Sequence, residues 1–397
     1  MVELKRTGRV VVVGAGMAGA QAALGLRRGG WEGRISLLGD EPHRPYDRPP
    51  LSKNVLLGTV ADTAFDIDWE HLGVELLPGR RALALEPGLL RTDAGELPYE
   101  ALVIATGAEP RPLPGAPGAR LLRTLDDARA LRERLRPGVR LVLAGAGWIG
   151  AETATVARQL GCEVTVVEAG PAPLAGALPG SLGAVMAGWY AAAGVALHCG
   201  VGVLAAEPGA VVLTDGTRLH ADELLVGIGA RPATGWLAGS AVGLDAAGTV
   251  LVDERLRTTA PGVWAAGDCV SYPSARAGAR LAVQHWDHAL QSGGAVAASL
   301  LGSDAPYDPV PYFWSEQFGR MVQYAGRHAG ADELLHRGSP EEPSWTVLWL
   351  RDGVLVAALS VDRPRDLNQA RRLIGSGAAL DRAMAADPAV QLKAAAA

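Results

Sequence analysis

The chain has 397 residues, of which 49% are hydrophobic and 20% are charged, which is typical of a globular protein of about two or three domains. Its formal net charge of −5 excludes a general nucleic-acid-binding protein, and it has no run of about 18 apolar residues that could span a membrane. The N-terminal residues lack the layout of a signal peptide, so we expect a cytoplasmic protein.

The first predicted element is a βαβ unit over residues 9–40. An apolar strand ends in the sequence Gly14-Ala-Gly16-Met-Ala-Gly19, and a helical stretch and a second apolar strand then lead to Asp40. In such a unit the first glycine permits the strand-to-helix turn, the second lets the backbone approach a pyrophosphate, and the third lets the helix pack on the strand. The helix N-terminus binds the phosphates and the acid binds a ribose, so we predict a dinucleotide site.

A second unit of the same kind begins near residue 139, after a proline-rich stretch at 110–118 that we interpret as a linker. Its strand ends in Gly145-Ala-Gly147-Trp-Ile-Gly150, and Glu168 follows its second strand. The intervals from first glycine to acid are 40 − 14 = 26 and 168 − 145 = 23 residues, both near the expected spacing of about 20. Two such units predict that two dinucleotides meet, as when a flavoprotein takes a hydride from a nicotinamide.

Three cysteines are present, Cys162, Cys199 and Cys269, and no two of them are spaced as a Cys-x-x-Cys redox pair. A flavoprotein that reduces disulfides needs a neighbouring dithiol, so the sequence argues against that activity. We expect the three side chains to be small buried residues in a reducing compartment, and we predict no metal site.

After the second unit the chain returns to the first through residues 258–268, and a helix is predicted over about 281–301. From Ser315 the pattern changes to alternating strands, with Arg351-Asp-Gly353 as a hairpin turn. We therefore predict an α/β protein with two Rossmann-like dinucleotide-binding domains and a small α+β domain. The first domain takes residues 1–111 and 245–314, the second is inserted at 112–244, and the third takes 315–397.

The segment Arg44-Pro-Tyr-Asp-Arg-Pro-Pro-Leu-Ser-Lys53 is more specific than either glycine loop. With both loops and the motifs Ala-Thr-Gly107, Ala-Gly-Asp268 and Tyr-Phe-Trp-Ser315, it resembles the FAD-dependent, NADH-utilising ferredoxin reductases of bacterial cytochrome P450 and aromatic-ring dioxygenase systems, which are related to apoptosis-inducing factor. The resemblance covers nearly the whole chain. It implies a glutathione-reductase-like fold with FAD in the first domain, NADH in the inserted domain and a [2Fe–2S] ferredoxin as partner. The sequence leaves the oligomeric state open, and a monomer is the default expectation.

The resemblance also implies roles for residues around the flavin. Arg48 would bind the FAD pyrophosphate, and Lys53 would place its ammonium beside flavin N5 with Glu152 as its buried partner. We expect Ser52 to cap the helix that follows and so to aim Lys53. Asp268 would bind the ribityl chain of FAD.

Further residues complete the implied cofactor sites. Thr106 and Gly107 belong to the FAD domain, and Trp286 and Trp314 are candidates to cover the flavin. Glu168 would bind the NADH ribose and repel the 2′-phosphate of NADPH. The chain departs from the family pattern at Ala282 and Gln284, where an arginine and a glutamate are usual, and we expect this to affect nicotinamide or partner contacts rather than FAD binding.

Two other functions are open on the sequence. The chain could be an NADH-sensing flavoprotein module resembling apoptosis-inducing factor, which a long-lived complex of reduced flavin with NAD and no ferredoxin partner would favour. It could also be a flavin reductase of quinones, which the absence of an amphipathic C-terminal anchor disfavours. A peroxide reductase is disfavoured because we expect none of the three cysteines to be a reactive thiol beside the flavin.

Overall fold

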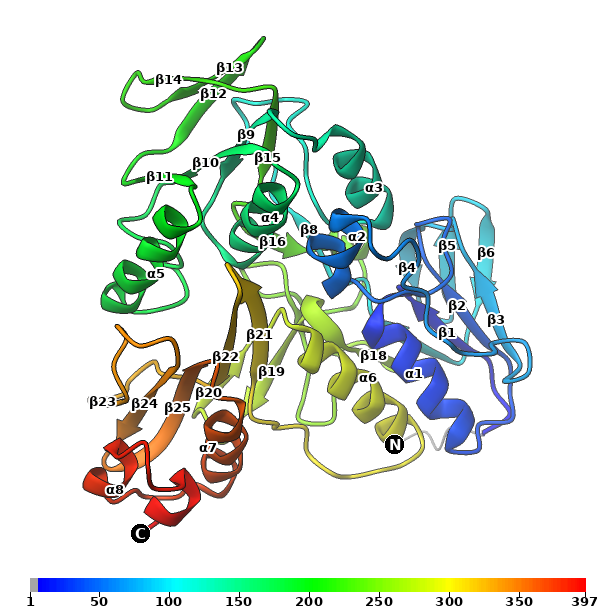
Figure 1. The fold of residues 1–397 in the computed structure, drawn as a ribbon. Coiled ribbons are helices and arrows are strands. Elements are labelled where there is room, and N and C mark those ends of the chain that lie inside the picture. Colours follow the sequence, from blue (N-terminus) through cyan, green and yellow to red (C-terminus); the bar gives the residue numbers. More distant parts are fainter. Residues whose placement is uncertain (1–5) are drawn as a thin grey trace. The chain divides into compact units, whose positions relative to one another are not determined.

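The structure is a computed structural model that describes residues 6–397 (Figure 1). The chain divides into two compact units, each discontinuous in sequence. Unit 1 takes residues up to 48, then 63–109 and 230–309, and unit 2 takes 49–62, 110–229 and 310–397. This division groups residues 49–62 and the C-terminal region with the inserted region, and the three domain boundaries given above stay a prediction. Residues 1–5, on which the expectation about a signal peptide partly depends, lie outside the described chain.

Unit 1 is built on a five-stranded parallel sheet in the order β18-β7-β1-β2-β3. The central strand β1 is a run of four valines, all of them buried, as expected for a parallel strand covered on both faces. Helices α1 and α6 pack against each other beside this sheet (Figure 1). The bounds are β1 (Val10–Val13), α1 (Met17–Arg28), β2 (Ile35–Leu38), β3 (Val74–Leu77), β7 (Ala101–Ile104), β18 (Val263–Ala265) and α6 (Trp286–Leu300).

Smaller antiparallel and mixed sheets complete unit 1. One contains β4 (Ala82–Glu86), β5 (Leu89–Thr92) and β6 (Gly95–Pro98), and another contains β17 (Val250–Leu251), β19 (Val270–Ser274) and β20 (Ala279–Leu281). Two short strands, β8 (Ala108–Pro110) and β16 (Ala230–Pro232), pair with each other. The helix predicted over 281–301 begins later, at Trp286, because residues up to Leu281 belong to β20.

Unit 2 contains a second parallel sheet, in the order β11-β10-β9-β15. Helix α3 begins with a capping box in which the Thr124 hydroxyl and the Asp127 carboxylate each accept a backbone N–H. The bounds are α2 (Asn54–Leu57), α3 (Leu125–Arg134), β9 (Arg140–Ala144), α4 (Trp148–Gln159), β10 (Glu163–Glu168), α5 (Gly180–Ala192), β11 (Ala196–Cys199) and β15 (Glu223–Val226), with an antiparallel sheet of β12 (Val203–Glu207), β13 (Ala210–Leu213) and β14 (Arg218–His220).

The C-terminal part of unit 2 is a five-stranded antiparallel sheet in the order β21-β22-β25-β24-β23. The predicted hairpin turn is confirmed: Asp352 and Gly353 have φ values of 51° and 79°, as a type I′ turn requires. The bounds are β21 (Tyr312–Gln317), β22 (Arg320–Gly326), β23 (Glu333–Arg337), β24 (Trp345–Arg351), β25 (Val354–Val361), α7 (Pro364–Ser376) and α8 (Arg382–Ala386). Two parallel sheets and one antiparallel domain confirm the predicted fold class. Within residues 6–397, no helix is both long and apolar enough to cross a bilayer.

A buried arginine holds the C-terminal domain together. The guanidinium of Arg337 is 1% exposed and donates through Nε to Asp366 at 2.9 Å. Its other nitrogens donate to the carbonyl oxygens of Ala385, Asp387 and Val390. One side chain of β23 therefore fixes α7 and the segment that follows α8, and its charge is balanced inside the protein.

We predict that Arg337→Met lowers the free energy of unfolding by about 3–5 kcal/mol, because three carbonyl oxygens lose their donor and the buried Asp366 carboxylate keeps only Arg363, at 2.8 Å, of its two arginine partners. Arg382→Met is the matched control, since Arg382 pairs with Glu333 at 2.8 Å but is 59% exposed, and we expect a loss of less than about 1 kcal/mol. Urea unfolding of both variants checks this. Equal losses would contradict it.

Candidate dinucleotide-binding sites

The three glycines of the first loop differ in what surrounds them. Gly14 has φ +113°, and a Cβ there would lie 2.1 Å from the carbonyl oxygen of Ala105. A Cβ at Gly19 would lie 1.9 Å from the carbonyl oxygen of Gly14. By contrast, the nearest atom to a Cβ at Gly16 is Arg48 Nε, at 4.0 Å. The first and third glycines are thus required by the chain itself, whereas the middle one leaves room beside a guanidinium.

The second loop repeats this arrangement. A Cβ at Gly145, which has φ +106°, would lie 2.4 Å from the carbonyl oxygen of Gly227, and one at Gly150 would lie 2.2 Å from that of Gly145. No described atom lies within 4 Å of a Cβ at Gly147. Helices α1 and α4 begin directly after Gly16 and Gly147, and within the described chain no side chain caps either of them. Their N-terminal N–H groups fit the pyrophosphate of a dinucleotide.

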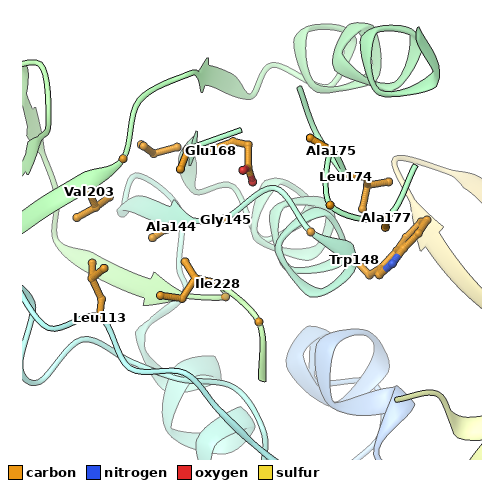
Figure 2. Close-up of a pocket in the computed structure, with 17 residues that line it drawn as sticks. Leu113, Ala144, Gly145, Trp148, Glu168, Leu174, Ala175, Ala177, Val203 and Ile228 are labelled. Atoms are coloured by element: carbon orange, nitrogen blue, oxygen red, sulfur yellow. The ribbon is translucent and has the colours of Figure 1, made fainter. Parts of the chain in front are cut away.

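A cavity of about 480 Å³ lies at the second loop, a size usual for small-molecule sites (Figure 2). In the view of Figure 2, Trp148 and Leu174 lie at one side, Leu113 and Val203 at the other, and Glu168 between them. The Glu168 carboxylate accepts hydrogen bonds from the backbone N–H groups of Ala146 and Gly170, both at 2.7 Å. Among the described residues that line the cavity, Glu168 is the only charged one.

Asp40 and Glu168, the acids of the two βαβ units, do not occupy equivalent positions. Val167 pairs with Ala144 before the second loop, and Leu38 pairs with Val13 before the first. The register equivalent of Glu168 is therefore Gly39, where a Cβ would lie 2.8 Å from the Cβ of Ala15. Asp40 lies one residue further along and is exposed. The contact between Asp40 and a ribose stays a prediction. If Asp40 makes that contact, it does so from one residue further along its strand end than Glu168 does.

Arg48 is held beside the first loop by two residues that the sequence interpretation missed. Its guanidinium donates to Glu41 Oε1 at 2.6 Å and to the Tyr46 hydroxyl at 2.9 Å. The Tyr46 hydroxyl in turn donates to Glu41 Oε2 at 2.6 Å. Both carboxylate oxygens of Glu41 are thus used to fix one planar cation, and planar cations suit the oxygens of a pyrophosphate. The only sequence feature that could have indicated this contact is an acid, Glu41, seven residues before the predicted arginine ligand.

The other predicted residues of unit 1 lie at strand and helix ends. Thr106 follows β7 and donates through Oγ1 to the Ala233 carbonyl at 2.8 Å, and Asp268 lies in the 3₁₀ turn Gly267–Cys269 after β18. Trp286 is the first residue of α6 and donates through Nε1 to Asp47 Oδ1 at 2.6 Å. Gly107 has φ +70°.

His285 precedes α6 and is uncharged near neutral pH. Burial lowers the pKa of its imidazole to about 4, although the nearby charge of Asp268 acts in the opposite direction. The same Asp268 charge favours the protonated form of Arg48. Within unit 1, Arg48 thus lies beside the first glycine loop and close enough to Asp268 for their charges to interact.

Within unit 2, Glu152 is the centre of a buried polar cluster. Its carboxylate is 4% exposed and accepts from Lys53 Nζ at 2.7 Å, as the resemblance implied. It also accepts from the hydroxyls of Ser52 at 2.5 Å and Ser315 at 2.7 Å. The expectation that Ser52 caps the following helix is wrong: Ser52 is the last residue of the 3₁₀ turn Pro49–Ser52, and the N-cap position of α2 is taken by Lys53, with no side-chain cap. Ser315, from β21, was not predicted as a partner.

The structure also locates Trp314 and the three cysteines. Trp314 lies on β21, stacked on Tyr312 with ring centroids 6.1 Å apart. The three cysteines are free; Cys162 and Cys269 are buried, but the expectation of burial is wrong for Cys199. That residue is exposed because it ends β11, the edge strand of its sheet.

Comparison with known proteins assigns the family. A model of the pyridine nucleotide-disulphide oxidoreductases matches residues 8–293, and a model described as reductase C-terminal matches residues 312–396. The chain belongs to the pyridine nucleotide-disulphide oxidoreductase family. It is 39% identical over 393 residues to the ferredoxin reductase component of chlorobenzene dioxygenase from Cupriavidus sp. (strain PS12), covering 95% of each chain. It is 33% identical over 405 residues to putidaredoxin reductase from Pseudomonas putida, covering 97% of this chain and 96% of that protein.

Solved structures of similar proteins agree with this assignment. The crystal structure of Fdr9 superimposes with a TM-score of 0.92 at 44% identity, covering 97% of this chain and 99% of that one. The covalent putidaredoxin reductase–putidaredoxin complex gives a TM-score of 0.93 at 32% identity, covering 97% of each chain. The family's folded architecture therefore extends over nearly the whole chain.

We predict that Lys53→Met lowers the free energy of unfolding by about 3–5 kcal/mol, because the Glu152 carboxylate then lies buried without a countercharge. Adding Glu152→Gln removes that charge and keeps an oxygen acceptor for one of the two serines, while the hydroxyl of the other can turn to accept from the amide NH2. The double variant should therefore lose less stability than the sum of the two single variants. Urea unfolding of all four proteins measures this coupling, and strictly additive losses would contradict it.

Proposed function

We propose that this chain is an FAD-dependent NADH:ferredoxin oxidoreductase whose [2Fe–2S] ferredoxin serves a cytochrome P450 or a ring-hydroxylating oxygenase. The observation that carries the proposal is the presence of two glycine loops in one chain, each with a middle glycine that leaves space for a pyrophosphate. Full-length similarity to ferredoxin reductase components supports the choice of electron acceptor. A monomer in the cytoplasm is part of the proposal, the latter supported by three free cysteines.

The residues of unit 1 fit FAD. The space at Gly16 would admit the pyrophosphate, and the cation of Arg48, already oriented by Glu41 and Tyr46, would bind its oxygens. Asp268 would bind the ribityl chain. Bound FAD supplies the redox chemistry, since it takes two electrons from NADH and gives them singly to ferredoxin.

Residues assigned to the flavin by resemblance keep those roles as proposals. Lys53 would place its ammonium beside the flavin, and Glu152 would hold that ammonium through the ion pair at 2.7 Å. Trp286 and Trp314 would cover the ring system. Gly14, Gly19, Thr106 and Gly107 would shape the backbone around it.

The residues of the second loop fit NADH. Gly145, Gly147 and Gly150 would bring the helix N-terminus to the pyrophosphate, and Glu168 would accept hydrogen bonds from the ribose hydroxyls. Its carboxylate is already oriented by two backbone N–H groups. A 2′-phosphate would meet a negative charge and no cation among the described residues that line this cavity, so the site should prefer NADH to NADPH.

The function is tested by the purified protein itself. It should be yellow, acid should release FAD, and NADH should bleach the flavin under anaerobic conditions and reduce a [2Fe–2S] ferredoxin when the protein is present in catalytic amounts. Release of FMN, or an apoprotein that reconstitutes with no flavin, would refute the cofactor assignment. A slow, long-lived reduced complex that reduces no ferredoxin would instead favour the NADH-sensing alternative.

We predict that Glu168→Gln lowers kcat/KM for NADH by about 10- to 100-fold and narrows the preference over NADPH, because a charge-assisted bond is lost and a repulsive charge is removed. Glu163→Gln is the matched control, since Glu163 is exposed at the opposite end of β10. Steady-state kinetics with NADH and with NADPH give the ratio of the two kcat/KM values. An unchanged ratio would show that Glu168 does not face the ribose.

A further inference from the structure

Side chains of α6 hold the peptide on each side of Gly267. Its N–H donates to Ser292 Oγ at 2.9 Å, and its carbonyl oxygen lies 3.2 Å from His288 Nε2. His288 and Ser292 are four residues apart and therefore neighbours on one face of the helix. They are 3% and 0% exposed, so water does not compete for these bonds. The two peptides that flank the Gly267 Cα are thus each fixed by a side chain of the same helix.

The protonation state of His288 follows from its partners. A carbonyl oxygen can only accept, so Nε2 carries the proton that is donated to Gly267. Burial lowers the pKa of the His288 imidazole to about 4, so the ring is neutral and Nδ1 is an acceptor. The Tyr307 hydroxyl lies 2.8 Å from Nδ1 and donates to it. Tyr307, His288 and Gly267 therefore form a hydrogen-bond chain with one direction.

The position of Gly267 links this hydrogen-bond chain to the neighbouring Asp268. Gly267 has φ +78°, and a Cβ there would lie 2.9 Å from the Cβ of Ala18 on α1. It begins the three-residue turn that contains Asp268, and a turn of this length has few hydrogen bonds of its own. The Gly267–Asp268 peptide, whose carbonyl His288 holds, leads directly into Asp268 and so bears on where that residue is placed.

We propose that Ser292, His288 and Tyr307 act as positioning residues that fix the two peptides flanking Gly267 and thereby orient Asp268 toward bound FAD. The inference rests on the proposed function, because it takes FAD as the ligand of Asp268. None of the three residues contacts the reacting atoms. Their effect is on how tightly the cofactor is held, which can be measured without turnover.

Two substitutions of His288 separate positioning from packing. His288→Gln places an amide N–H near the Nε2 position and can still donate to Gly267, whereas His288→Asn places its amide near Nδ1 and cannot. We expect FAD release, followed by the recovery of free-flavin fluorescence, to stay within about 3-fold of the unaltered protein for His288→Gln and to be about 10-fold faster for His288→Asn. A role in packing alone would give both variants the same release rate.

Tyr307 has its own matched control. Tyr272 stacks on the His288 ring at 5.2 Å, and among the described residues no hydrogen bond joins its hydroxyl to that ring. Tyr307→Phe should release FAD about 3- to 10-fold faster, and Tyr272→Phe should change the rate by less than about 2-fold. The Tm of each apoprotein is recorded in parallel, so that general destabilisation is measured separately.

The possible results distinguish failure of the positioning role from failure of the proposed function. Equal release rates for His288→Gln and His288→Asn, or for Tyr307→Phe and Tyr272→Phe, would overturn the positioning role while the protein still binds FAD and reduces ferredoxin. An unaltered protein that binds no FAD would overturn both the positioning role and the proposed function. Faster release in the His288→Asn and Tyr307→Phe variants with intact apoprotein Tm supports the role.

Discussion

The buried carboxylate of Glu152 is the constraint on which unit 2 depends. It is 4% exposed, and its negative charge is stable there only because three donors from two distant segments reach it. Ser52 and Lys53 come from the turn before α2, and Ser315 comes from the first strand of the C-terminal sheet. The helix α4, that turn and the C-terminal sheet are therefore joined by one polar centre.

The same helix connects this centre to the nucleotide loop. α4 begins at Trp148, directly after Gly147, and Glu152 lies only five residues from that glycine, a rise of about 7.5 Å. The N–H groups that would bind the NADH pyrophosphate and the carboxylate that holds Lys53 are thus fixed on one rigid element. The spacing between these N–H groups and the Glu152 carboxylate is therefore set by the helix itself.

The sequence predicted what local pattern determines and missed what only the folded chain brings together. Glycine loops, buried valine strands and the Asp352-Gly353 turn depend on neighbouring residues, so their signals are visible in the sequence. Glu41 and Ser315 have no such signal, because their roles arise from segments that are distant in the chain or in a loop. The assignment of Ser52 as a cap failed for the same reason: the helix begins one residue later than expected, after Lys53, and the partner of the Ser52 hydroxyl is a buried carboxylate 100 residues away.

The two loops share a backbone arrangement but differ in the charged side chains beside them, and under the proposed function this difference would separate a resident cofactor from an exchanging one. At the first loop a guanidinium fixed by Glu41 and Tyr46 lies beside Gly16, so a pyrophosphate gains charge-assisted bonds as well as backbone N–H groups. At the second loop the described residues that line the cavity offer no cation, and the pyrophosphate would depend on the helix N-terminus alone. Weaker attraction at the second loop suits a dinucleotide that must leave after each hydride transfer, and stronger attraction at the first suits a flavin that stays.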